Sequence, residues 1–172
     1  TYASVGQVLV KSGIACAGGH AFKLTLTGVG THAISPQDGS DVISTAMQII
    51  DSWQSMLSRQ IDPQQPVVLS VCSIHAGEMG ATNVLPSTAV FSGTIRTFND
   101  PLRESILKKM RQRAESISKF NGCTCMMEEE YQFPVLVNHD AVTQIVKQAA
   151  VEVVGPNAVF TVPEPSIGSE DF

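Results

Sequence analysis

The most regular pattern in the chain is a strict alternation of apolar and polar residues from Phe22 to Thr27. A period of two predicts a strand with one buried face, here the face of Phe22, Leu24 and Leu26. Three more stretches rich in apolar and β-branched residues predict further strands, at 67–76, 88–98 and 123–131. These four segments are long enough to form the strands of one sheet.

Two segments with helical periodicity separate these strands. The first begins at Ser40-Asp41, a helix N-cap signal, and its apolar stripe continues to about Ser58. The second begins at Asn99-Asp100-Pro101 and continues to about Phe120. The order strand, helix, strand, strand, helix, strand is the split βαβ pattern. We therefore expect an α+β fold, a ferredoxin-like βαββαβ open-faced sandwich with both helices on one face of the sheet.

The pattern changes outside residues 22–133. The first part contains a short apolar strand at 8–10 and a loop rich in glycine and alanine at 13–21. The last part contains an amphipathic helix from Asp140 and a short strand at 158–162. These elements do not fit the four-stranded unit. We interpret 1–21 and 134–172 as fragments of a second α/β domain into which 22–133 is inserted.

Composition excludes several functional classes. Hydrophobic residues make up 43% of the 172 residues and charged residues 16%, which is typical of a globular protein. The net charge of −5 argues against nucleic-acid partners, and no apolar run approaches the roughly 20 residues that span a membrane. Four cysteines without a CxxC pair predict buried, reduced thiols and a cytoplasmic protein. Because the chain lacks an initiator Met, we expect a piece of a longer protein.

Two loops carry candidate polar ligands. In Gly28-Val-Gly-Thr-His-Ala33 two glycines precede His32, so the imidazole either meets a ligand as a donor or acid, or is satisfied by solvent. Asn83 stands before an apolar pair and Pro86, where an amide commonly caps the backbone of a turn. Residue spacing alone leaves a ligand-binding role and a structural role open for each side chain.

Charged candidates lie on a central strand and near the end of the chain. Arg96 points out of the open face of strand 88–98, where it either pairs with Glu128 or Glu130 or binds an anionic substrate. A guanidinium group suits a carboxylate because its planar fork binds both oxygens. The pattern around Glu170, within Gly168–Phe172, predicts a solvated loop or an N-cap. His20, His75 and His139 show no metal-ligand spacing, and we expect them to be structural or solvent-facing.

Four motifs in order carry a family resemblance: Gly28–Ala33, Asn83–Pro86, Gly93–Phe98 and Gly168–Phe172. Together they resemble the metal-dependent aminoacylase and carboxypeptidase family. The most similar branch contains the hippurate hydrolases, the N-acyl-amino-acid amidohydrolases and the auxin-conjugate hydrolases. The resemblance covers nearly the whole chain.

The resemblance implies a catalytic domain with two divalent metal ions, zinc or manganese, and an inserted lid domain through which the protein forms a homodimer. The metal ligands and the general base would lie before Thr1 and beyond Phe172. This chain is therefore expected to bind no metal and to hydrolyse nothing alone. The whole enzyme would cleave the amide bond of N-acyl-amino acids or small peptides.

The resemblance also assigns roles to four side chains. His32 would donate a hydrogen bond to the substrate carbonyl as it becomes an oxyanion, in many members within the active site of the neighbouring subunit. Asn83 and Arg96 would bind the free carboxylate of the substrate or nearby polar groups. Glu170 would lie at the rim of the active site. The alternative is a non-catalytic ferredoxin-like regulatory or dimerisation module, which has no need to place Arg96 and His32 on one side of the open sheet.

Overall fold

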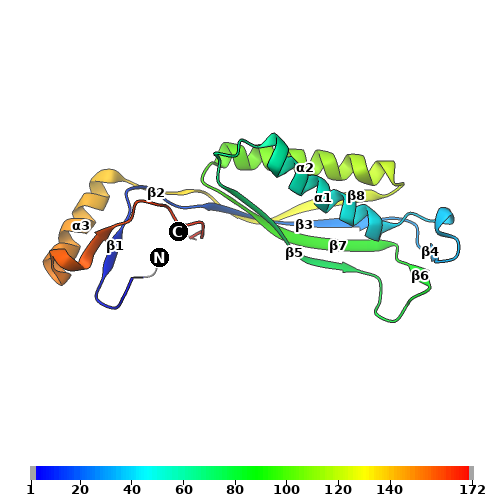
Figure 1. Ribbon diagram of the computed structural model, residues 1–172, viewed down its shortest axis with the longest axis horizontal. Coiled ribbons are helices and arrows are strands. Elements are labelled where there is room, and N and C mark those ends of the chain that lie inside the picture. Colours follow the sequence, from blue (N-terminus) through cyan, green and yellow to red (C-terminus); the bar gives the residue numbers. More distant parts are fainter. Residues whose placement is uncertain (1–2, 171–172) are drawn as a thin grey trace.

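A four-stranded antiparallel sheet dominates the computed structural model, which describes residues 3–170. Its strands lie in the order β5-β7-β3-β8 and have these bounds: β3 Gly18–Thr27, β5 Val67–Ala76, β7 Thr88–Thr97 and β8 Thr124–Phe133. Two helices, α1 (Val42–Gln60) and α2 (Asp100–Phe120), cover one face of this sheet, as Figure 1 shows. The expected βαββαβ open-faced sandwich is confirmed.

Both helices begin where the sequence predicts. The Asp41 carboxylate accepts hydrogen bonds from the backbone N–H groups of Ile43 and Ser44, at 2.9 and 3.0 Å. The Asn99 side chain accepts one from the N–H of Leu102 at 3.0 Å. These caps satisfy donors that the first helical turn leaves without partners, and they fix where each helix starts.

The core lies between the helices and the sheet, with Trp53 of α1 at its centre. The Trp53 ring is fully buried, meets the ring of Phe22 edge-on at 5.4 Å and lies 5.5 Å from the ring of Phe91. Its indole N–H donates to the carbonyl of Met110 at 3.0 Å, so the buried donor is satisfied. Below it, a Cβ at Gly93 would lie 2.0 Å from a backbone oxygen of β5 and 2.8 Å from the Phe22 ring, so only glycine fits.

Strand β7 shows how the two faces differ. Its odd-numbered residues from Ala89 to Thr97 are buried under the helices, whereas Val90, Ser92, Thr94 and Arg96 are only partly buried. On this strand the open face therefore carries side chains that water can cover without a second layer of helices. The expectation that Arg96 lies on the open face of this strand is confirmed.

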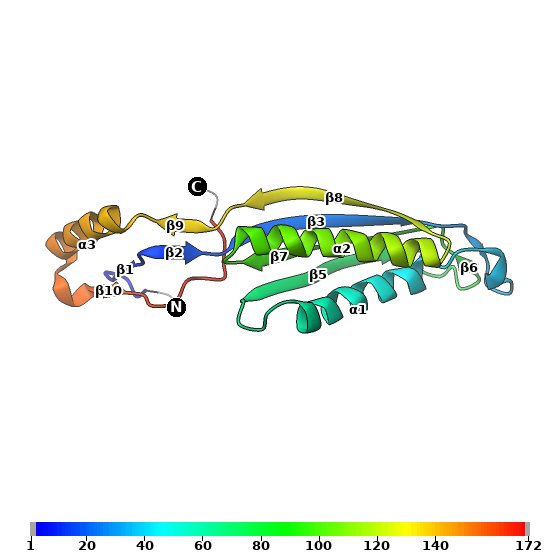
Figure 2. The same cartoon turned by 90° about the horizontal axis from the view of Figure 1, so that it is seen from above.

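A smaller unit adjoins one end of the sandwich, as Figure 2 shows. In it β1 pairs with β10 in parallel, β2 pairs with β9 in antiparallel, and α3 packs beside β1 and β10. The bounds are β1 Val8–Val10, β2 Gly13–Cys16, β9 Leu136–Asn138, α3 Asp140–Val154 and β10 Val159–Thr161. We call this small unit of β1, β2, β9, α3 and β10 the flanking unit. The structure also has two 3-10 turns, η1 at Pro36–Asp38 and η2 at Pro156–Ala158.

The loop expected at 13–21 is wrong. Residues 13–16 form β2, and β3 begins at Gly18, four residues before the predicted start at Phe22. All five residues from Gly18 to Phe22 are buried, so this part of β3 lacks the alternation that marks a half-buried strand. As a result β3 runs through the boundary that we had placed between residues 21 and 22.

Candidate functional site

His32 and Asn83 are brought together by a two-stranded ribbon at the far end of the sheet from the flanking unit (Figure 1). Strand β4 (Thr31–His32) pairs antiparallel with β6 (Val84–Leu85), with His32 directly opposite Val84. The N–H of Ala33 donates to the carbonyl of Asn83 at 2.9 Å. Both elements lie in segments that we had expected to be loops.

The glycines before His32 allow two backbones to approach closely. A Cβ at Gly28 would lie 2.7 Å from the carbonyl oxygen of Ser40, and one at Gly30 would lie 3.0 Å from that of Leu85. The N–H of Gly28 also donates to the carbonyl of Ser87 at 2.8 Å. The glycine pair therefore holds the ribbon against its neighbours and fixes the place of His32.

The His32 ring has a defined donor. It is exposed, and its Nδ1 accepts a hydrogen bond from the N–H of Ile34 at 3.3 Å. An imidazole that accepts at Nδ1 carries its proton on Nε2 when it is neutral. The Nε2–H group of His32 is thus the one that can donate to a ligand.

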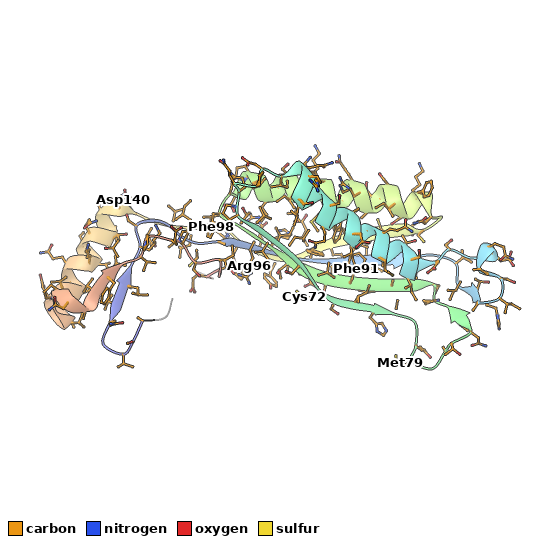
Figure 3. All side chains as sticks on the ribbon, viewed as in Figure 1. Cys72, Met79, Phe91, Arg96, Phe98 and Asp140 are labelled. Atoms are coloured by element: carbon orange, nitrogen blue, oxygen red, sulfur yellow. The ribbon has the colours of Figure 1, made fainter. Side chains whose placement is uncertain are left out.

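Arg96 lies near the other end of β7, close to the flanking unit, as Figure 3 shows. Its Nη1 donates to the hydroxyl of Ser169 at 3.0 Å and to the carbonyl of Ile167 at 3.5 Å. The segment that supplies these acceptors is itself anchored, because the N–H of Ala17 donates to the carbonyls of Ser166 and Gly168, at 2.9 and 3.0 Å. Arg96 and the 166–170 segment therefore form one cluster.

The pairing of Arg96 with Glu128 or Glu130 is not observed. Within residues 3–170 no ion pair includes Arg96, and Glu128 pairs with Lys23 of β3 at 3.3 Å. The hydrogen bonds of Arg96 in this part of the chain use Nη1 alone. Its Nε and Nη2 can therefore offer a carboxylate two parallel donors.

The two clusters lie at opposite ends of the sheet. Thr88 begins β7 close to the ribbon of His32, and Arg96 follows eight residues later in the strand. An extended strand of that length spans about 26 Å. The His32 cluster and the Arg96 cluster are therefore far apart within one chain. The alternation of β7 predicted the face of Arg96, but the distance depends on the tertiary position of the ribbon.

Glu170 is exposed and lies close enough to Cys16 to affect its titration. Burial raises the pKa of the Cys16 thiol, and the negative charge of Glu170 raises that pKa further. The two following residues of the motif, Asp171 and Phe172, lie outside the described part of the chain. Ser169, the partner of Arg96, was not singled out from sequence, since a serine in a polar loop gives no signal of its own.

The cysteines and histidines complete the inventory of reactive side chains. All four cysteines are free, but the expectation of buried thiols holds for Cys123 alone: Cys72 is exposed, and Cys16 and Cys125 are half-buried. His20 is buried with its Nε2 3.4 Å from the carboxylate of Glu129. Burial lowers the pKa of His20, and the charge of Glu129 partly opposes that shift. His75 and His139 are exposed.

The described residues hold no ready metal centre. Among residues 3–170 no group of three or more His, Cys, Asp or Glu side chains is placed to hold a metal ion. The pair of His20 and Glu129 has Arg111 on the same carboxylate at 2.7 Å, which disfavours a cation there. In the same part of the chain, no helix has the length and apolar character needed to cross a membrane.

Comparison with known proteins gives a consistent family. The family described as the peptidase dimerisation domain matches residues 14–121. Thermostable carboxypeptidase 2 of Saccharolobus solfataricus is 33% identical over 97% of this chain and 41% of its own length. An IAA-amino acid hydrolase ILR1-like 4 of Arabidopsis thaliana is 34% identical over 98% of this chain and 39% of its own. The N-acetyl-L-cysteine deacetylase of Bacillus subtilis is 33% identical over 98% and 39%.

Solved structures agree with these sequence matches. A Bacillus subtilis protein described as a dinuclear metal-binding peptidase of the M20 family superposes with a TM-score of 0.69 at 25% identity, covering 96% of this chain and 40% of that one. The aminobenzoyl-glutamate utilization protein of Klebsiella pneumoniae has the same fold, with a TM-score of 0.78 at 19% identity over 98% of this chain and 42% of that one. This chain spans about two fifths of the relatives that it matches. It belongs to the peptidase dimerisation domain family of the M20 peptidases.

Proposed function

We propose that this chain is the lid and dimerisation portion of a metal-dependent amidohydrolase that cleaves the amide bond of N-acyl-amino acids. The names of the relatives support this reaction, since they include a deacetylase of an N-acetyl-amino acid and a hydrolase of an amino-acid conjugate. In this proposal 22–133 is the lid, and 1–21 and 134–172 belong to the catalytic domain. Two divalent metal ions, zinc or manganese, would be bound outside this segment, in a cytoplasmic enzyme.

The chemistry of the ribbon cluster suits the developing negative charge. The free Nε2–H of His32 would donate to the carbonyl oxygen of the scissile amide as that oxygen becomes an oxyanion. One fixed donor of this kind contributes about 3–4 kcal/mol to the transition state. Asn83, held beside His32 by the backbone hydrogen bond from Ala33, would offer its amide to the same substrate.

The chemistry of the second cluster suits the other end of the substrate. The unused Nε and Nη2 of Arg96 would hold the free carboxylate of the amino-acid part in a two-point contact. Glu170 would lie at the rim of the same site. The polar atoms of the substrate would thus be divided between two clusters.

The separation of these clusters is the observation that carries the proposal. An N-acyl-amino acid is far shorter than the roughly 26 Å of strand between them, so one chain cannot supply both to one substrate molecule. A dimer resolves this conflict if His32 and Asn83 of one protomer enter the active site of its partner. Arg96 would then serve the active site of its own protomer.

The charges of the edge strands support dimerisation through β5. Both edge strands contain a β-bulge, so the bulges do not distinguish the two edges. The charges of the side chains do. β8 carries three successive glutamates, Glu128 to Glu130, whereas β5 has no Asp, Glu, Lys or Arg. Charged side chains protect an edge strand against pairing, and uncharged edges invite it. We infer that β5 pairs with β5 of a second copy.

A mixed dimer tests the shared site. In the whole enzyme we would combine a His32→Ala protomer with an Arg96→Ala protomer, each with its own affinity tag, and purify the mixed dimer. If His32 acts across the dimer, one of the two sites carries both substitutions and the other carries none. The mixed dimer should then regain about half the activity of the wild type, although each pure variant is nearly inactive.

The opposite result has an equally clear meaning. If His32 and Arg96 serve the same protomer, every site of the mixed dimer lacks one of them and no activity returns. A matched control mixes His32→Ala with Asn83→Ala, because these side chains lie in one cluster. That pair should regain no activity, because each protomer then supplies one substituted side chain to the site of its partner and neither site is intact. Absence of activity in the first mixture, or its return in the control, would overturn the shared site.

A further inference from the structure

We propose that a hollow beside the His32 ribbon binds the acyl group of the substrate and makes the enzyme prefer apolar acyl groups larger than acetyl. The hollow has a volume of about 560 Å³ and lies between β5, β6 and β7. Pockets that bind small molecules commonly measure about 300–1,000 Å³. The inference rests on the proposed amidohydrolase function and assigns the part of the substrate that the hollow takes.

The lining of the hollow is apolar on two sides. Val84, Leu85 and Pro86 form the wall next to the ribbon, and Val90 contributes from the open face of β7. The opposite wall comes from His75 and the loop that carries Glu78. Val84 is 55% exposed, so an apolar ligand in the hollow would cover surface that water now contacts.

The position of the hollow selects the acyl group over the amino-acid part. Val84 lies directly opposite His32 in the ribbon, so both side chains project from the same face. In the proposed reaction the Nε2–H of His32 bonds the scissile carbonyl, to which the acyl group is attached directly. The hollow beside it is therefore within reach of the acyl chain.

Charge leads to the same assignment. The residues that line the hollow include Glu78 and no lysine or arginine. A free carboxylate would be repelled by Glu78 and would lose its hydration against valine, leucine and proline. Arg96, which suits a carboxylate, lies at the other end of the sheet. The uncharged half of an N-acyl-amino acid thus fits the hollow better than the charged half.

The test measures kcat/KM of the whole enzyme on one amino acid carrying acetyl, butanoyl, hexanoyl or benzoyl groups. Each buried methylene is worth up to about fourfold, so hexanoyl should exceed acetyl by roughly tenfold or more. Val84→Trp places an indole in the hollow and should lower the hexanoyl-to-acetyl ratio by about tenfold. The ratio is internal to each variant, so a loss of folded protein does not change it.

A matched control places tryptophan elsewhere on the same face. Met126 is 58% exposed and lies on β8, at the opposite edge of the sheet. Met126→Trp should leave the acyl ratio at the wild-type value. An unchanged ratio in Val84→Trp, or a wild type that treats all acyl groups alike, overturns the acyl assignment while the amidohydrolase function stands. A wild type that cleaves no N-acyl-amino acid at all overturns the function and the acyl assignment with it.

Discussion

Helices α1 and α3 have similar sequences in one respect and opposite surroundings. Both carry apolar residues at helical spacing, and both have an acidic residue at or near their N-terminus. In α1 the stripe is covered, with Val42, Ala46, Ile49, Trp53 and Met56 buried against the sheet. In α3 Thr143 is the only buried residue, while Ile145 is 67% exposed and Val153 is 83% exposed.

This difference separates a unit that covers its own apolar surface from one that does not. The core cluster of the chain lies wholly between Phe22 and Cys123, inside the sandwich. An amphipathic stripe that faces water adds little to stability and marks a surface that another element covers. The exposed stripe of α3 therefore fits a flanking unit that continues into the catalytic domain of the proposed enzyme.

Hydrogen exchange should reveal the largest difference between the two units. In the 172-residue chain, we expect the amides of β3 and β7 to exchange only on global unfolding of the sandwich. Those of α3 should exchange through local opening, at a free energy lower by several kcal/mol. Equal protection of both units, measured by mass spectrometry at several pH values, would contradict the comparison.

Single substitutions in α1 and α3 should also change the free energy of unfolding by different amounts. Trp53→Ala removes a fully buried ring that touches Phe22 and Phe91, and it should lower the free energy of unfolding by about 3–5 kcal/mol. Ile145→Ala, on the exposed stripe of α3, should change it by less than about 0.5 kcal/mol in the same chain. Urea unfolding followed by circular dichroism measures both. A comparable loss from Ile145→Ala would mean that the stripe is covered in solution.

Acid should weaken the sandwich through His20. Burial lowers the pKa of this histidine in the folded state, against the opposing charge of Glu129 and with a smaller contribution from Arg103. The unfolded chain therefore takes up a proton near pH 6.5 that the folded chain refuses, and stability falls as the pH drops below that value. His20→Gln should reduce this dependence between pH 7.5 and 5.5. An identical pH profile in the variant would remove His20 from the explanation.

The sandwich was predictable because its local signals agree with one another. The alternation in 22–27, the caps at Asp41 and Asn99 and the odd-even faces of β7 each depend on neighbouring residues. The flanking strands were predicted less well. β9 has only three residues, and β2 lies in a glycine-rich segment, so their pairing depends on contacts between distant parts of the chain.

The candidate side chains were identified from sequence, but their grouping was not. His32 and Asn83 are 51 positions apart, and a backbone hydrogen bond between β4 and β6 joins their neighbours. Arg96 meets Ser169 across an even longer separation. Motif order carries no information on which of these segments meet. The catalytic and binding roles of the four residues stay proposals, and the mixed dimers test those of His32, Asn83 and Arg96.

The unequal edges of the sheet also limit how far assembly can proceed. If two copies join through β5, each has used its one uncharged edge, and the strands left at both outer margins are β8 with its glutamates. A third copy would meet like charges instead of a free template. The pairing contact is the same on both copies, so it closes on itself. Such a protein forms a dimer and does not extend into a fibre, because neither outer strand of the dimer offers an uncharged edge to a further copy.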